Sequence, residues 1–151
     1  MLGADTVSRQ RRALWLSILF SMIGELIILI VWGVFLYPTG ELVTKFLWTV
    51  VFCGLGMGSA VGALLVLFVV GRVHGRAAVV ASMLLSALVL GVGCNLLCFQ
   101  LDAHYFHFFG ATASPALFIG NGVVMSLLGG ALVGWLVFTE RGASHLTRYG
   151  L

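Results

Sequence analysis

Glu25 is the residue whose position most suggests chemistry, because it stands in the middle of a long apolar run. It follows Arg12 by 13 residues, or about 20 Å along a helix. A charged carboxylate within a membrane costs several kcal/mol unless it is paired, hydrated or protonated. Two interpretations stay open: a proton relay, cation site or partner contact, or a protonated side chain hydrogen-bonded to a neighbouring helix. Because no Lys or Arg stands at that depth in the other runs, an ion-pair partner would be another chain or a bound ion.

A second layer of polar and sulfur-containing residues is expected beyond Glu25, about 27–29 Å along the helices from their arginine-rich ends. Its members come from three different runs and are Cys53, Cys94, Asn95 and Asn121. Equal depth permits a hydrogen bond between Asn95 and Asn121, and such bonds stabilise membrane bundles by about 0.6 kcal/mol on average. Cys94 and Cys98 stand one turn apart and leave metal binding or redox chemistry open, although buried cysteine usually behaves as a small apolar side chain.

The segment from Gln100 to Phe109 offers a carboxylate and two imidazoles. If it is helical, His104 and His107 share one face at i,i+3 spacing. Together with Asp102 they form a candidate site for copper, zinc or iron, and haem ligation is a further option. The competing interpretation is an amphipathic loop at the membrane interface, with the histidines in water and the aromatic side chains among the headgroups.

Four apolar runs, each of about 20 residues or more, are long enough to cross roughly 30 Å of hydrocarbon as helices. In lipid, every backbone donor and acceptor needs a partner within the segment, which favours helices. We therefore predict an all-α integral membrane protein, a four-transmembrane-helix bundle that forms one domain over residues 1–151. The expected spans are about 13–37, 42–70, 77–100 and 116–139, with an interfacial outer loop over about 101–115.

Composition agrees with a lipid-facing surface. The chain is 61% hydrophobic and 9% charged, against about 45–50% and about 25% in soluble domains. Its mean hydropathy is +1.14. The formal net charge of +3 resides at the chain ends and one turn instead of on one basic face, so we expect no nucleic-acid partner.

Basic residues predict the orientation. Arginines precede the first expected span, lie in the turn between the second and third spans, and follow the fourth span. These three segments would lie on the same side of the membrane, and the residues are Arg9, Arg11, Arg12, Arg72, Arg76, Arg141 and Arg148. The opposite loops hold Lys45, Glu41 and Asp102. Because cytoplasmic loops are enriched in Lys and Arg, both termini are expected in the cytoplasm, in a bacterial-type inner or plasma membrane.

Two stripes of small residues recur at four-residue spacing. The second span carries Gly54, Gly58 and Gly62, and the fourth carries Gly122, Ser126, Gly130 and Gly134. Small residues let helix backbones approach closely in lipid. The stripes either hold this bundle together or, for one of them, face a partner subunit.

The function we expect is a small accessory or structural subunit of a larger membrane complex of the respiratory, photosynthetic or membrane oxygenase type. Its loops are too short for a conventional active site, so catalytic activity of its own is not expected. Partners would be membrane lipids and other membrane-protein subunits. Bound lipid or pigment would fill the grooves beside the small-residue stripes.

Two alternatives stay open. The chain resembles the small multidrug resistance exporters in its helix count and in the glutamate of the segment Met22–Leu26, although it is longer and lacks their other motifs. That resemblance implies an oligomeric transporter, or a proton- or cation-coupled channel, in which Glu25 is essential. The other alternative is a metal-binding membrane subunit that uses Asp102, His104 and His107.

Overall fold

The computed structural model describes residues 2–36, 41–107 and 114–150, and these residues form helices joined by turns. Four of the helices are long and apolar enough to cross a membrane, as the sequence predicts. Their segments are α1 (Leu2–Ile28) with η1 (Leu29–Leu36); α2 (Leu42–Phe46), η2 (Leu47–Gly54) and α3 (Leu55–Phe68); α4 (Gly75–Ser86), η3 (Ala87–Cys94), α5 (Asn95–Leu101) and η4 (Asp102–Phe106); and α6 (Pro115–Phe138). The η segments are π-helical turns within continuous helices. A shorter helix, α7 (Glu140–Arg148), follows the fourth.

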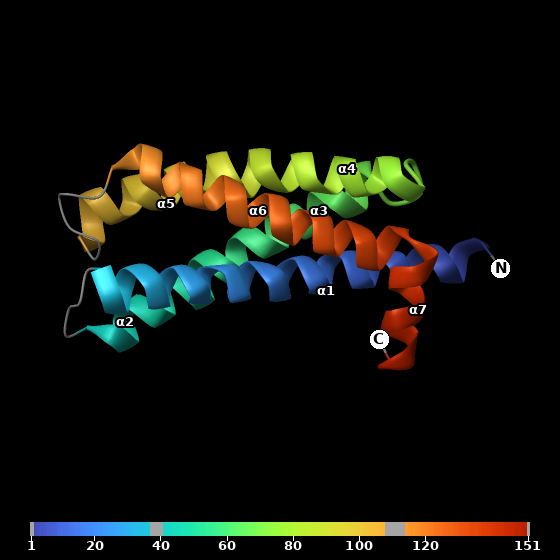
Figure 1. Cartoon of the computed structure of the whole chain (residues 1–151), viewed down its shortest axis with the longest axis horizontal. Coiled ribbons are helices and arrows are strands. Elements are labelled where there is room, and N and C mark those ends of the chain that lie inside the picture. The colour runs from blue at the N-terminus through green and yellow to red at the C-terminus, as the bar shows by residue number, and fades with distance from the viewer. Residues whose placement is uncertain (1, 37–40, 108–113, 151) are drawn as a thin grey trace.

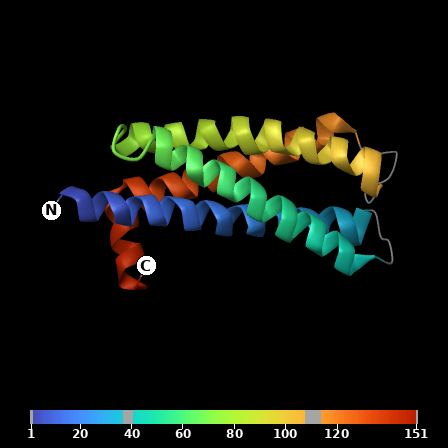
Figure 2. The same cartoon turned by 180° about the vertical axis from the view of Figure 1, so that it is seen from behind.

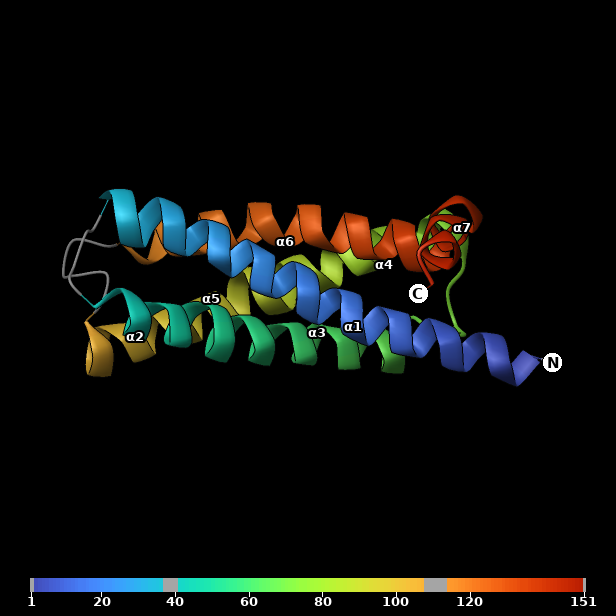
Figure 3. The same cartoon turned by 90° about the horizontal axis from the view of Figure 1, so that it is seen from below.

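The four long helices lie side by side (Figure 1), and both chain termini lie at one end of the bundle. The turn between α3 and α4 lies at that same end (Figure 2), which we call the terminal end. The opposite end, where α2 and η4 lie, is called the far end. α1 packs against α3 and α6, and α6 packs in turn against α4 and η3 (Figure 3).

Two helix boundaries differ from the expected ones. The first helix begins at Leu2, where Asp5 and Arg9 form an i,i+4 ion pair of 3.0 Å that supports an added polar turn. The third helix continues to Phe106, so residues 101–106 are helical and were wrongly assigned to an interfacial loop. The helix ends at His107, which adopts a left-handed conformation with φ 54° and donates its N–H to the Asp102 carbonyl.

α7 was not predicted and projects sideways from the bundle at the terminal end (Figure 1). Thr139 caps it, since its Oγ1 accepts a hydrogen bond of 3.1 Å from the Gly142 N–H. A side chain at Gly142 would collide with the backbone of Trp135, so glycine is required for this close approach. Leu146 fixes the helix to the bundle because it is buried against apolar residues of other helices.

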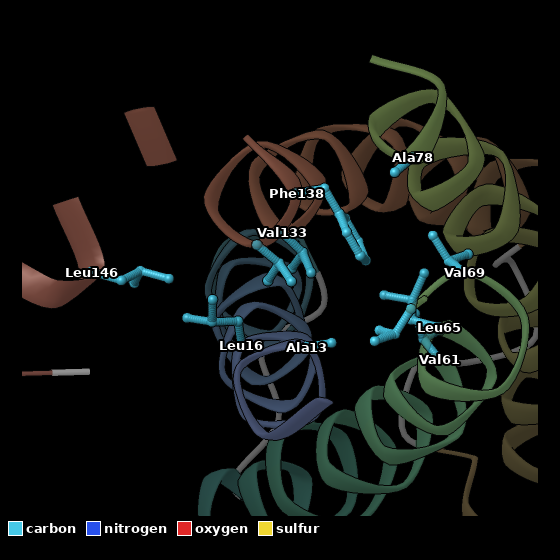
Figure 4. Packing of buried hydrophobic residues seen from close by; sticks show 11 residues of the cluster. Ala13, Leu16, Val61, Leu65, Val69, Ala78, Val133, Phe138 and Leu146 are labelled. Carbon is cyan, nitrogen blue, oxygen red and sulfur yellow. The ribbon is translucent and has the colours of Figure 1, made fainter. Parts of the chain in front are cut away.

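An apolar core fills the terminal half of the bundle (Figure 4). Its residues come from five helices and from the turn after α3, and are Ala13, Leu16, Val61, Leu65, Val69, Val70, Ala78, Val133, Val137, Phe138 and Leu146. Leu65 and Ala78 have no exposed surface. This end of the bundle is therefore closed by close-packed side chains.

Both small-residue stripes are used within the bundle. A Cβ at Gly58 would lie 2.6 Å from the Cα of Ile18 in α1, and Gly54 and Gly62 make similar approaches along the same helix. On α6, a Cβ at Gly130 would lie 2.9 Å from the Cα of Met83. Gly122 and Gly134 also face the third span, and Ser126 is buried between them. The hypothesis that one stripe faces a partner subunit is therefore wrong.

Candidate functional site

Glu25 lies inside its own bundle, with only 6% of its surface exposed. It belongs to a line of buried residues at every fourth position of the first helix, namely Ala13, Ser17, Ser21, Glu25 and Leu29. Residues on the other side of this helix, such as Ile23 and Ile27, are exposed. The carboxyl group therefore points toward the other three spans.

Two small cavities meet at Glu25. A distal cavity of about 20 Å³ lies toward the far end, and a central cavity of about 40 Å³ lies toward the terminal end. Glu25, Ile28 and Asn95 line both. A water molecule needs about 10–15 Å³ of such space, so the cavities have room for one to a few waters.

Buried hydroxyl groups surround these cavities. Ser17, Ser21 and Ser126 line the central cavity, and Thr49 lines the distal one. Among the described side chains, the oxygen atoms of these four residues are buried and have no hydrogen-bond partner within the protein. Because buried polar atoms in native proteins are nearly always hydrogen-bonded, the cavities are suited to water or a small hydrated ion.

Lys45 and Asp102 place opposite charges beside the distal cavity. Lys45 has no exposed surface and Asp102 is 6% exposed. The two residues interact electrostatically, and Asp102 lines the distal cavity near Thr49. Asp102 was expected in the outer loop, which is wrong, whereas Lys45 falls inside the predicted second span; each of the two lies on the inward face of a helix. Attraction between opposite charges offsets part of the cost of their burial.

The three proposed metal ligands do not come together. Asp102 points inward, whereas His104 and His107 are exposed. The Nδ1 atom of His104 lies 2.8 Å from the Gln100 carbonyl, within its own helix. In residues 2–36, 41–107 and 114–150, no group of three His, Cys, Asp or Glu side chains is placed to hold a metal ion. Phe108 and Phe109, expected among the headgroups, lie outside the described residues.

The two asparagines share a cavity but are not paired. Asn95 and Asn121 both line the distal cavity, in agreement with their equal expected depth. Asn95 Nδ2 donates to the Leu90 carbonyl at 2.7 Å, and its amide packs against Gly122. The expected Asn95–Asn121 hydrogen bond is thus replaced by one within the third helix, and α6 contributes a glycine surface instead.

The close cysteine pair is also different from the expected one. Cys53 in η2 and Cys98 in α5 have their Sγ atoms 3.0 Å apart and both line the distal cavity. Cys94 and Cys98, one turn apart in sequence, do not form this contact. Only the rotation of the second and third helices about their axes creates it, and no local sequence signal indicates that rotation.

No known protein family, curated protein or solved structure matches this chain. Its chemistry is therefore inferred from the polar interior, which we define as Glu25, Lys45, Thr49, Asn95, Asp102 and the serines Ser17, Ser21 and Ser126. The group combines one carboxyl at the junction of two cavities with hydroxyls able to donate and accept protons. Such an arrangement can hold a proton, a water chain or a small cation.

Proposed function

We propose that this protein moves protons or small cations in a membrane, with Glu25 as the group that binds and releases them. The observation that carries this proposal is the position of Glu25 at the junction of two water-sized cavities, lined by hydroxyls that have no hydrogen-bond partner among the described residues. Ionisable residues within membrane spans are rare and usually mark ion pathways or proton relays.

The size of the cavities argues for a proton or a small ion as the cargo. Cavities for organic ligands measure about 300–1,000 Å³, whereas those at Glu25 measure about 20 and 40 Å³. A drug-sized molecule would require large helix movements. A proton passed between waters, hydroxyls and the Glu25 carboxyl requires only side-chain rotation, because each of these groups both donates and accepts.

The polarity of the bundle suggests the direction of exchange. The polar interior extends from Glu25 toward the far end through Thr49 and Asp102, and toward the terminal end as far as Ser17, beyond which the apolar core closes the bundle. With both termini cytoplasmic in a bacterial-type inner or plasma membrane, Glu25 would exchange protons with the outer side. Transfer to the inner side then requires the apolar core to loosen, which makes its opening the controlling step.

An accessory subunit remains the competing proposal, but its positive support is reduced. The sequence favoured it partly because the small-residue stripes and Glu25 were available for partner contacts. Both now lie within the bundle. Metal binding by Asp102, His104 and His107 is also less favoured, because the two histidines point away from the buried carboxylate.

Proton flux into liposomes tests the proposal. The full chain is reconstituted with a pH-sensitive dye inside, and flux is driven by a proton gradient and a potassium diffusion potential. We expect flux above that of protein-free vesicles, falling to their level in Glu25→Gln and persisting in Glu140→Gln, a control acid in α7. Equal flux in the wild type and Glu25→Gln, or none above protein-free vesicles in the wild type, would refute proton transport by this chain.

A further inference from the structure

A separate groove lies at the terminal end, between α1 and α7. Its volume is about 480 Å³, within the range of small-molecule binding clefts. Two arginines and four apolar side chains line it: Arg11, Arg12, Trp15, Leu16, Leu19 and Leu146. Unlike the cavities at Glu25, this groove is large, open and positively charged at one end.

The lining residues are ordered by polarity along α1. Arg11, Trp15 and Leu19 are spaced at i, i+4 and i+8 and so form one stripe, about 12 Å long. Trp15 is 64% exposed and Leu19 is 51% exposed, whereas Leu16 and Leu146 are buried beneath them. The stripe passes from a guanidinium to an indole and then to an aliphatic side chain. Phospholipids follow the same order from phosphate to acyl chain, with tryptophan enriched at the interface between the two.

α7 provides a fixed second wall. The Thr139 cap, the Gly142 contact with α6 and the buried Leu146 together hold this helix against the bundle. A helix in this position lies in the plane of the membrane interface, where amphipathic helices contact lipid headgroups. The groove therefore opens at the depth where a phosphate and the first part of an acyl chain meet.

Charge favours an anionic ligand. Arg11 and Arg12 both line the groove, and none of its lining residues is acidic. Arg9, on the same helix, does not line the groove and forms an ion pair with Asp5 at 3.0 Å. Two guanidinium groups can bind phosphate oxygens through charge-assisted hydrogen bonds.

We propose that this groove binds one anionic phospholipid of the leaflet at the terminal end, with its phosphate at Arg11 and Arg12. One acyl chain then lies along Trp15 and Leu19 above the Leu16–Leu146 floor. A soluble anion would use only the charged end, and a zwitterionic lipid would bring a cationic group toward the arginines. The site does not depend on the proposed function of Glu25.

Native mass spectrometry of the purified full chain tests this site. Phosphatidylglycerol and phosphatidylcholine with identical acyl chains are titrated separately, with inorganic phosphate as a third ligand. The wild type should retain one phosphatidylglycerol in preference to phosphatidylcholine. Arg11→Gln/Arg12→Gln should bind it about 30-fold more weakly, since each basic residue near a lipid surface contributes about 1 kcal/mol, or about fivefold. The control Arg72→Gln/Arg76→Gln, at the other turn of the same end, should bind as the wild type does.

Several results would overturn the proposal. Equal retention of the two lipids would remove the charge preference, and an equal loss in both arginine variants would indicate general surface attraction. Displacement of the lipid by inorganic phosphate alone would indicate an anion site without an acyl-chain groove. Thermal unfolding without lipid shows whether Arg11→Gln/Arg12→Gln folds. If it does not fold, phosphatidylglycerol binding by Trp15→Ser tests the site instead. This substitution should weaken phosphatidylglycerol binding without changing the preference over phosphatidylcholine, and unchanged binding would contradict the site.

Discussion

The two halves of the bundle place opposite kinds of side chain on the same helix faces. On the second span, the buried residues at every fourth position run from Lys45, Thr49 and Cys53 at the far end to Met57, Val61 and Leu65 at the terminal end. On the first helix the buried polar positions Glu25, Ser21 and Ser17 continue further toward the terminal end, where Ala13 follows them. An all-apolar interior would avoid the cost of burying charges and orphaned hydroxyls. A bundle that accepts this cost from the far end as far as Ser17, but not at its terminal end, indicates that the polar interior serves a purpose other than stability.

The largest effect is expected from removing a side chain of the apolar core. Leu65→Ala should lower the free energy of unfolding by about 2–5 kcal/mol, because Leu65 is completely buried and its removal leaves a cavity. Unfolding by sodium dodecyl sulfate in mixed micelles measures this change. The exposed Leu67→Ala is the matched control on the same helix, and an equal loss in both variants would contradict a close-packed terminal half.

The next largest effect is expected at the contact between α1 and α3 that joins the two halves. Gly58→Ala should destabilise the protein by about 1–3 kcal/mol, since its Cβ would lie 2.6 Å from the Ile18 Cα. Gly56, two residues away, has open space where a methyl group would be added, so Gly56→Ala should be neutral or stabilising by up to about 1 kcal/mol. The same unfolding assay compares the two, and similar values would disprove this helix contact.

A chemical cross-link tests the packing of the far half. Cys53 and Cys98 lie with their Sγ atoms 3.0 Å apart, so diamide should join them within one chain with the loss of two protons and two electrons. Peptide mass spectrometry should find this disulfide in the wild type and in Cys94→Ala. A linked Cys94 in the wild type, or no link at all, would show that the second and third helices are rotated differently.

The smallest stability effect is expected in the polar interior itself. Thr49→Val removes a buried hydroxyl that has no hydrogen-bond partner within the described part of the protein, at nearly constant shape. We expect a change in unfolding free energy between zero and about 1 kcal/mol, in the stabilising direction. A loss of more than about 1 kcal/mol would show that this hydroxyl supports the fold and would weaken the contrast between the halves.

Sequence alone predicted what depends on length and composition. The four apolar helices and the small-residue faces follow from hydrophobic length and four-residue spacing. α7 was missed because it is short and mostly polar, although Thr139 followed by Glu140 is a typical helix start. The third helix was ended too early because polar residues at Gln100 and Asp102 suggested a loop.

The composition of the polar interior could not be predicted, because it depends on the rotation and packing of the helices. Whether Lys45 and Asp102 point inward depends on the rotation of each helix about its axis, which hydropathy does not report. The Cys53–Cys98 contact depends in addition on how the second and third helices pack. Glu25 was identified because a carboxylate in an apolar run is unusual by itself, whereas its neighbours became recognisable only when the helices were assembled.

The most direct measurement of the central claim is infrared difference spectroscopy of the reconstituted protein while the proton gradient is reversed. We expect a protonated-carboxyl band that grows and declines with the gradient and is absent in Glu25→Gln, while Glu140→Gln retains it. A Glu25 band that stays constant under both gradients would identify a permanently protonated structural side chain and would contradict the proposed exchange of protons.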